Sequence, residues 1–342
     1  MHGLLSCLLL ALATDRAAFI DWTSYEDFLF SAADPEGRLG MPPWHELFSL
    51  PGRRWQAWDA RHAPQLLAKQ RRGDVMALDM RARDTIRKLA TEDPTSWNAS
   101  VVELRGLYQS FIPLLVHVNP HLRAKLAGWY DDDAFRQLFC ALLQPSEAVV
   151  RDTKELLSRH GRPMVGVHLR TTALNKGHVH SSWTAQRRLL DCTMATMARS
   201  TVARPPVFIA ADTELARRRA RTFFEQRGLE VIASEPQGNR SGAGQSFGSR
   251  MAALVDMLLL ASCSELFVHE RSTFSSTAYG IAGRRPYMVA PWDGLNCKQQ
   301  PSAEPCAHSV RTARGLVSRL LGGGRSSNTT LPASVSYQLK CN

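Results

Sequence analysis

The chain has 342 residues, of which 44% are hydrophobic and 21% are charged, and its formal net charge is +11. These values exclude a disordered or fibrous protein and allow two folded domains of ordinary size. The positive charge suits an anionic ligand. The basic residues are scattered, however, and no zinc-finger spacing or RNA-binding strand signature accompanies them, so we expect no nucleic-acid partner. The densest basic cluster is predicted to be the solvated face of a helix and comprises Arg217, Arg218, Arg219 and Arg221.

Seven cysteines are spread from Cys7 to Cys341, too sparsely for a disulfide-built scaffold, and no C-x-x-C pair indicates zinc or redox chemistry. Only Cys297 and Cys306 look like a local pair, and we predict a disulfide between them of the kind that forms in the secretory pathway. Three N-glycosylation sequons agree with that compartment and begin at Asn98, Asn239 and Asn328.

Residues 3–13 (GLLSCLLLALA) are as apolar as the core of a signal peptide, and their last three residues resemble a cleavage site. They lack a basic segment before them, and they fall far short of the roughly 20 apolar residues that a membrane span needs. They lead directly into residues 17–22, which predict a strand. Our preferred interpretation is a buried helix followed by a strand. The first domain is then expected to be incomplete at its N-terminus, with a preceding strand and an anchor outside this sequence.

The rest of the first half is less regular. Residues 23–64 are loop-rich and aromatic, a mixture that suits carbohydrate stacking but more often packs into a core. Residues 65–93 are strongly charged and weakly periodic, residues 101–118 predict a strand or a helix, and Asn119 with Pro120 predicts the start of a helix.

A D-x-D triplet, which signals metal and sugar-nucleotide binding in one glycosyltransferase architecture, occurs at residues 131–133. It follows no apolar strand here. We therefore interpret it as a solvated cap for a helix over residues 134–143, and we expect no metal site.

After residue 145 helices and strands alternate at a spacing that predicts a parallel, doubly wound sheet. This second, Rossmann-like domain lacks G-x-G-x-x-G, so nicotinamide binding is not supported. We expect domains at 1–145 and 146–310, followed by a tail at 311–342. Predicted strands cover 164–169, 207–211, 229–232, 266–268 and 287–289, and predicted helices cover 147–158, 183–199, 213–226, 249–261 and the residues from about 273.

Polar side chains gather where these strands end, which is where open α/β sheets bind ligands. The stretch 164–172 (MVGVHLRTT) ends in His168, Arg170 and two hydroxyl residues. A guanidinium offers planar, bidentate donors for a phosphate or diphosphate. The alternative is that Arg170 only pairs with a surface carboxylate. As a strand-end residue facing solvent, Arg170 should add little to core packing.

Two further segments reach the same edge of the predicted sheet. Asp212 follows a strand and could accept from a base or ribose, or cap the next helix. The segment 270–276 (ERSTFSS) places hydroxyl groups and backbone N–H groups at a helix N-terminus, where an anion binds. A plain N-cap explains Ser272 or Thr273 equally well.

The order of these segments resembles the GT-B fucosyltransferase superfamily, and the closest group is the plant and algal xyloglucan-type α-1,2-fucosyltransferases. The resemblance covers segments of both domains. It does not include residues 65–93 or the tail. One departure is the start, since the family's Gly-rich turn before the first helix is reduced here to Met1, His2 and Gly3. The matching segments are 165–170 (VGVHLR), 208–212 (FIAAD), 253–263 (ALVDMLLLASC), 272–275 (STFS), 279–283 (YGIAG), 114–145 and the Cys-containing 297–308.

The resemblance implies two Rossmann-like domains facing a cleft, with GDP-fucose held mainly by the second, no cofactor and no metal. It also implies a Golgi lumen location, with membrane attachment only through an anchor absent from this chain. By position, Arg170 would contact the donor diphosphate, His168 would support that strand end and Asp212 would face the nucleoside. Phosphate or fucose would be held by Ser272, Thr273, Phe274 and Ser275.

The resulting hypothesis is inverting transfer of fucose from GDP-fucose to a hydroxyl of a cell-wall or glycan galactoside, an oligosaccharide or polysaccharide. Arg170 and the hydroxyl-rich loop would stabilise the leaving diphosphate. The alternatives are a protein or chitin-oligosaccharide fucosyltransferase and a non-catalytic nucleotide-sugar-binding family member. The catalytic base is not assigned, and its candidates are Asp21, Glu26, Asp27, His178 and His180.

Overall fold

The computed structural model divides the chain into two compact units. The first holds the described residues of 1–22, 50–144 and 304–342, and the second those of 23–49 and 145–303. The domain bounds expected from the sequence, 1–145 and 146–310 with a tail at 311–342, stay a prediction. The structure describes residues 2–16, 18–20, 48–49, 55–57, 75–79, 82–105, 115, 118–126, 134–160, 163–171, 183–199, 204–233, 247–269, 272–289, 297–300, 302–303 and 305.

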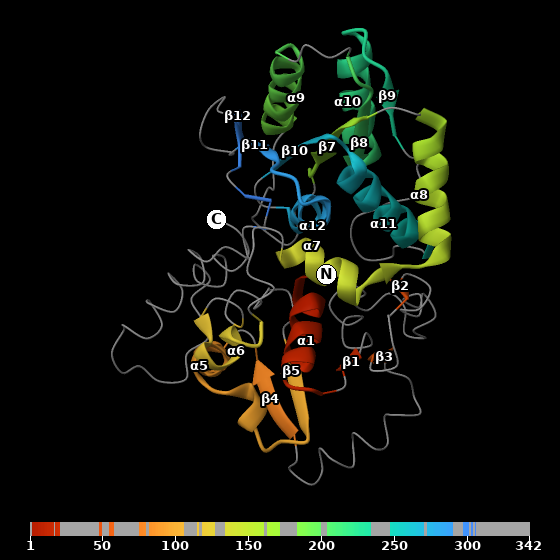
Figure 1. Cartoon of the computed structure of the whole chain (residues 1–342). Coiled ribbons are helices and arrows are strands. Elements are labelled where there is room, and N and C mark those ends of the chain that lie inside the picture. The colour runs from red at the N-terminus through yellow and green to blue at the C-terminus, as the bar shows by residue number, and fades with distance from the viewer. Residues whose placement is uncertain are drawn as a thin grey trace, which may run out of the picture. The chain divides into compact units, whose positions relative to one another are not determined.

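A six-stranded sheet forms the centre of the second unit, in the order β12-β11-β10-β7-β8-β9 (Figure 1). All neighbours pair in parallel except β12, which runs antiparallel to β11. The predicted parallel sheet is thus confirmed. The strand that was not predicted is β12, which is short and lacks an apolar run. The strands are β7 (Val165–Leu169), β8 (Val207–Ala211), β9 (Val231–Ile232), β10 (Glu265–His269), β11 (Tyr287–Val289) and β12 (Cys297–Gln299).

Helices cover both faces of this sheet, as a doubly wound fold requires. The two helices α9 and α10 contact each other over one face, while α11 contacts both α8 and α12 over the other (Figure 1). The helices are α8 (Glu147–His160), α9 (Trp183–Met197), α10 (Glu214–Glu225), α11 (Phe247–Ser262) and α12 (Thr273–Ala282).

Strand β7 is buried along its whole length, and its side chains alternate between the two helix layers. Val165, Val167 and Leu169 pack into the core beneath α9 and α10. The opposite face is crowded at Gly166, where a Cβ atom would lie 2.9 Å from Cys263 Sγ. Only glycine permits this approach of the end of α11 to the strand. His168 lies on that same face two residues later.

The sheet order places a topological switch point beside β7. The chain moves from β7 to β8 and β9 on one side, and then crosses to β10 and β11 on the other. The connection after β7 leads to one side of the sheet, and the connection after β10 leads to the other. In doubly wound sheets, ligands bind at this switch point, outside the carboxyl ends of the strands. The residues that follow β7 and β10 are therefore the first place to look for a site.

The first unit contains parallel strand pairs, β1 with β3 and β4 with β5. A further two-stranded sheet joins β2, which belongs to the second unit, and β6, whose two residues span the sequence boundary between the units. Residues 65–93, which are only weakly periodic in sequence, hold β4 and α5, and α5 buries Ile86, Leu89 and Ala90 at helical spacing. The elements are α1 (His2–Ala13), β1 (Ala18–Ile20), β2 (Phe48–Ser49), β3 (Trp55–Ala57), β4 (Val75–Asp79), α5 (Arg83–Thr91), η1 (Pro94–Ser96), β5 (Val101–Arg105), α6 (Pro120–Arg123), α7 (Ala134–Leu142) and β6 (Gln144–Pro145).

Helix α1 confirms the interpretation of the apolar N-terminal run as a buried helix followed by a strand. Leu5, Leu8 and Leu9 are fully buried, as expected for a helix that is apolar on nearly all sides. Just after it, Arg16 donates to the carbonyl oxygens of Pro94 at 3.0 Å and Trp97 at 2.8 Å. In the part of the chain that the structure describes, no helix is long and apolar enough to cross a membrane.

Other predictions for the first half have mixed outcomes. The helix start at Asn119 is confirmed, because the Asn119 side chain accepts from the backbone N–H groups of His121 and Leu122. Helix α7 confirms the helix predicted over residues 134–143. The D-x-D triplet at residues 131–133 and most of the aromatic segment 23–64 lie outside the described residues.

The disulfide predicted between Cys297 and Cys306 is wrong. Cys297 in β12 instead pairs with Cys192 in α9, across a Cα–Cα distance of 5.6 Å and a sequence separation of 105 residues. The sheet edge and the helix that covers it bring together two cysteines that the sequence keeps far apart. The bond links the antiparallel edge strand β12 covalently to α9.

Peptide mapping without reduction should recover a peptide pair containing Cys192 and Cys297. Replacing Cys192 by alanine should lower the free energy of unfolding by about 2–5 kcal/mol, because a long loop of the unfolded chain is no longer closed. Denaturant unfolding measures this loss, with Cys140→Ala, which removes an exposed free thiol, as the control. Recovery of a pair containing Cys297 and Cys306 would contradict the assignment.

Candidate functional site

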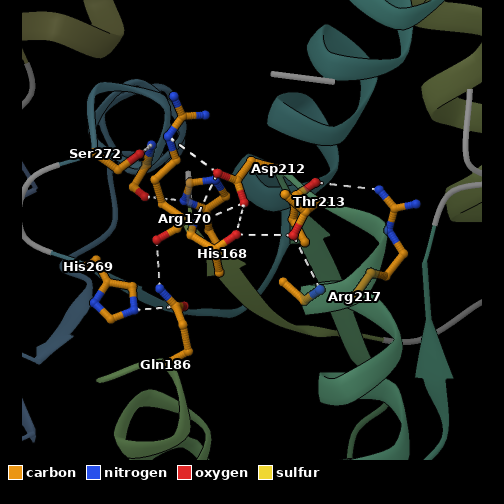
Figure 2. A network of polar contacts seen from close by, with 12 residues as sticks. His168, Arg170, Gln186, Asp212, Thr213, Arg217, His269 and Ser272 are labelled. Carbon is orange, nitrogen blue, oxygen red and sulfur yellow. Dashed lines mark hydrogen bonds and ion pairs between the residues drawn. The ribbon is translucent and has the colours of Figure 1, made fainter. Parts of the chain in front are cut away.

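A network of polar side chains lies at the carboxyl ends of β7, β8 and β10 (Figure 2). At its centre Arg170, the first residue after β7, pairs with Asp212, the first residue after β8, with 3.6 Å between Arg170 Nε and Asp212 Oδ2. The Asp212 side chain is 3% exposed, whereas that of Arg170 is 20% exposed. Arg170 thus pairs with a buried carboxylate.

Asp212 also binds the backbone next to Arg170. Each of its carboxylate oxygens accepts from the Thr171 backbone N–H at 3.0 Å, and Oδ1 accepts from Thr171 Oγ1 at 2.9 Å. The alternative that Asp212 caps the following helix is wrong, because Thr213 fills that position and accepts from the backbone N–H of Ala216. Asp212 therefore orients Arg170 and the chain that follows it. That Asp212 faces a nucleoside stays a prediction.

His168 lies in β7, two residues before Arg170, and its side chain projects toward α12. Its Nδ1 lies 2.6 Å from Ser275 Oγ, and its ring stacks on Phe274 with 4.8 Å between ring centroids. Burial, and next the neighbouring positive charge of Arg170, lower the pKa of His168 to about 3. The imidazole is therefore neutral near pH 7. It connects β7 to α12 without adding a second positive charge.

The N-terminus of α12 carries the hydroxyl-rich segment singled out in the sequence. Ser272 is the N-cap, and its side chain accepts from the backbone N–H of Ser275. Thr273 and Phe274 complete the first turn. Backbone N–H groups of a first helical turn and the positive end of the helix dipole favour an anion. His168, two residues before Arg170, lies 2.6 Å from Ser275 in this first turn, so the end of β7 and the start of α12 lie side by side (Figure 2).

Several residues of the network were not predicted. Gln186 in α9 donates through Nε2 to the Arg170 carbonyl oxygen at 2.7 Å, and its Oε1 lies 2.9 Å from Nε2 of His269, the last residue of β10. A histidine at a strand's carboxyl end was a signal of the same kind as Arg170. A polar residue on the buried face of a predicted helix was the signal for Gln186.

The prediction of a solvated arginine face on α10 is wrong for Arg217. Its side chain is 5% exposed, pairs with Glu214 at 2.9 Å and also donates to the Ala211 carbonyl oxygen. Arg218 and Arg221 do remain exposed. Arg217 differs from them because it lies on the helix face that packs against β8, where its guanidinium meets the polar end of that strand.

Some predicted site residues lie outside the described part of the chain. These are all five candidate bases, Asp21, Glu26, Asp27, His178 and His180, together with Glu270 and Arg271. Among the residues that are described, no three His, Cys, Asp or Glu side chains are grouped as a metal site would require. That donor binding needs neither metal nor cofactor stays a prediction.

Comparison with known proteins agrees with this architecture. No protein-family model and no curated protein sequence matches the chain. Among solved structures, an arginine-to-lysine mutant of Arabidopsis thaliana FUT1 in complex with GDP matches with a TM-score of 0.57 and 17% identity, over 89% of this chain and 72% of that one. The chain has the GT-B fold of that structure.

A second GT-B fucosyltransferase, NodZ, is also similar to the chain. NodZ α-1,6-fucosyltransferase soaked with GDP-fucose matches with a TM-score of 0.53 and 16% identity, over 87% of this chain and 94% of that one. The same enzyme co-crystallised with GDP gives a TM-score of 0.55 and 15% identity, over 87% and 93% of the two chains. At these identities the likeness concerns the fold alone.

The buried histidines of the network should make stability depend on pH. Burial also lowers the pKa of His269, to about 4. Both rings stay neutral in the folded chain while they bind protons in the unfolded chain below about pH 6.5. The unfolded state then binds more protons, so the free energy of unfolding should fall as the pH drops from about 6.5 toward 4.

Denaturant unfolding across that pH range tests this dependence. His168→Asn, which keeps a polar group near Ser275 but cannot titrate there, should flatten the slope. His121→Gln, which changes an exposed histidine of the first unit, should leave the slope unchanged. An unaltered slope in His168→Asn would show that folding does not lower the pKa of His168.

Proposed function

We propose that this chain is a fucosyltransferase that uses GDP-fucose as its donor. The observation that carries the proposal is the position of Arg170, held by a buried carboxylate at the switch point of the sheet, two residues after His168, which contacts the first turn of α12. Solved proteins of the same fold include fucosyltransferases in complex with GDP and one soaked with GDP-fucose. A diphosphate is the part of that donor which a guanidinium and a helix N-terminus recognise.

The same groups suit the chemistry of transfer. Negative charge grows on the diphosphate as the bond to fucose breaks, and preorganised donors stabilise that charge more in the transition state than in the substrate. Arg170 supplies the fixed charge, and the first turn of α12 supplies N–H groups. His168 is neutral and acts by packing against Phe274 and Ser275.

For the acceptor, we propose a hydroxyl of a galactoside in a cell-wall polysaccharide or a glycan, which attacks with inversion at the fucose carbon. This choice rests on the xyloglucan-type order of the sequence segments. A protein or a chitin oligosaccharide is the alternative acceptor. A non-catalytic protein that binds nucleotide sugar is the alternative of another class, and it would bind GDP-fucose without releasing GDP.

Release of GDP from GDP-fucose, measured with and without a panel of acceptors, separates these functions. Arg170→Ala should lower the rate about 10²-fold or more, since one preorganised donor is lost. Arg170→Lys should retain more activity than Arg170→Ala but clearly less than the wild type, because lysine keeps the charge without the planar fork. A chelator should change none of these rates if transfer is metal-independent.

The outcome for stability differs from the sequence-based expectation that Arg170 adds little to the fold. Arg170→Ala leaves Asp212 buried without its guanidinium partner, so the free energy of unfolding should drop by about 1–3 kcal/mol. Arg218→Ala, an exposed arginine of α10, is the matched control for both rate and stability. Unchanged GDP affinity in a destabilised Arg170→Ala variant would make Arg170 a structural residue and overturn the proposed donor site.

We also propose that the protein works in the secretory pathway, in the Golgi lumen. A disulfide between Cys192 and Cys297 supports an oxidising compartment, where such bonds persist. In the first unit, Asn98 and Ser100 of one sequon are both exposed, between η1 and β5. Both features suit a lumenal protein.

If the protein passes through the secretory pathway, Asn98 should carry an N-linked glycan. Treating protein from a eukaryotic secretory host with an N-glycosidase should increase its mobility on a gel, and Asn98→Gln should remove one step of that shift. Ala99→Ser, which preserves the sequon, is the control. An unglycosylated Asn98 in secreted protein would count against the compartment.

A further inference from the structure

The peptide group that joins Arg170 to Thr171 is held from both ends by buried side chains. Gln186 Nε2 donates to its carbonyl oxygen at 2.7 Å, and the Asp212 carboxylate accepts from its N–H at 3.0 Å. The first bond comes from α9 and the second from the end of β8. Because this peptide plane is fixed at both ends, the direction of the Arg170 Cα–Cβ bond is restricted.

The bond to the Arg170 carbonyl also determines how the Gln186 amide is turned. Because Nε2 points at a carbonyl oxygen, Oε1 must face His269 Nε2, which lies 2.9 Å away. An amide oxygen only accepts, so Nε2 of the neutral His269 ring carries the proton. The three groups therefore form a directed chain in which His269 donates to Gln186 and Gln186 donates to the backbone of Arg170.

The His269 ring has no competing partner in this part of the molecule. Its Nδ1 is buried and has no hydrogen-bond partner among the described residues. Its lowered pKa keeps the ring neutral near pH 7. Both the tautomer and the orientation of the ring are thus set by the bond to Gln186, whose own side chain is fully buried.

This chain of hydrogen bonds lies on the face of the sheet opposite to α12. In β10, Phe267 packs into the core beneath α9 and α10, and His269 follows two residues later on the same face. His168 lies on the other face, against Ser275 of α12. Gln186 therefore binds the Arg170 backbone from the sheet face opposite to α12, and His269 binds Gln186 on that same face.

We infer that Gln186 is a positioning residue for Arg170, and that His269 fixes the Gln186 amide for this task. The inference rests on the proposed function, since it assigns to Arg170 the binding of the GDP diphosphate. In this role Gln186 and His269 act through the Arg170 backbone and not by binding the nucleotide themselves. Their effect on GDP affinity must then disappear when the Arg170 guanidinium is absent.

A double-mutant cycle measures this dependence. Gln186→Met keeps the volume of the side chain but removes both hydrogen bonds, so the affinity for GDP should fall about tenfold, which corresponds to about 1.4 kcal/mol. In the Arg170→Ala background the same substitution should change GDP affinity by less than about twofold. Ligand-observed NMR titration with GDP reads the weak dissociation constants of the Arg170→Ala variants.

Two further variants complete the cycle. His269→Leu removes only the bond between His269 and Gln186, so we expect a smaller loss of about threefold, which also disappears without Arg170. This variant tests the inference if Gln186→Met fails to fold. Thr193→Val is the matched control, because Thr193 is another fully buried polar residue of α9 and its hydroxyl bonds only the helix carbonyl of Leu189. It should leave GDP affinity unchanged.

The outcomes separate the inference from the proposed function. If the wild-type chain does not bind GDP, the proposed function fails. If Arg170→Ala weakens GDP binding while Gln186→Met and His269→Leu do not, the inference alone is overturned. A tenfold effect of Gln186→Met that persists in the Arg170→Ala background also overturns it, because Gln186 would then act on the nucleotide by a route that does not pass through Arg170.

Discussion

The ion pair between Arg170 and Asp212 is the interaction on which the arrangement of this site depends. A carboxylate that is 3% exposed is stable only where charge and hydrogen-bond donors replace the water it has lost. Asp212 obtains them from the Arg170 guanidinium and from the N–H and hydroxyl of Thr171. The same contacts that stabilise Asp212 therefore determine how the chain leaves β7. Stability and the geometry of the site arise from one set of bonds.

The layers of the sheet supply the rest of that geometry. Because β7 lies between β10 and β8, its carboxyl end receives side chains from both neighbours. Alternation along the strands then sends His168 toward α12 and His269 toward α9. The absence of a side chain at Gly166 allows the end of α11 to pack closely against β7. This contact lies on the same face of the sheet as His168.

The charge distribution of the network follows from burial. His168 and His269 both have pKa values far below that of a free histidine, so neither adds positive charge near neutral pH. Among the described residues that follow β7 and β10, the site presents the Arg170 guanidinium and the N–H groups of the first turn of α12. Such a site recognises an anion through its shape and its hydrogen bonds, and it keeps the same charge over the physiological pH range.

The sequence by itself determined the elements whose patterns are local. The strand at 207–211 was predicted to the residue, because five consecutive apolar residues ending in an aspartate indicate a buried parallel strand. The apolar run of α1, the cap at Asn119 and the hydroxyl-rich start of α12 were likewise readable from neighbouring residues. Arg170 was identified because its position after a buried strand has functional meaning in any doubly wound fold.

Only the tertiary structure decided which distant residues meet. Asp212 lies 41 residues from Thr171, Gln186 lies 83 residues from His269, and Cys192 lies 105 residues from Cys297. Each pairing depends on strand order and on the face that a helix presents, which local patterns leave open. For that reason the sequence suggested the nearby Cys306 as the partner of Cys297, and a solvated face for Arg217. Proximity along the chain predicts a helix or a strand, whereas a buried polar partner is chosen by the fold that surrounds it.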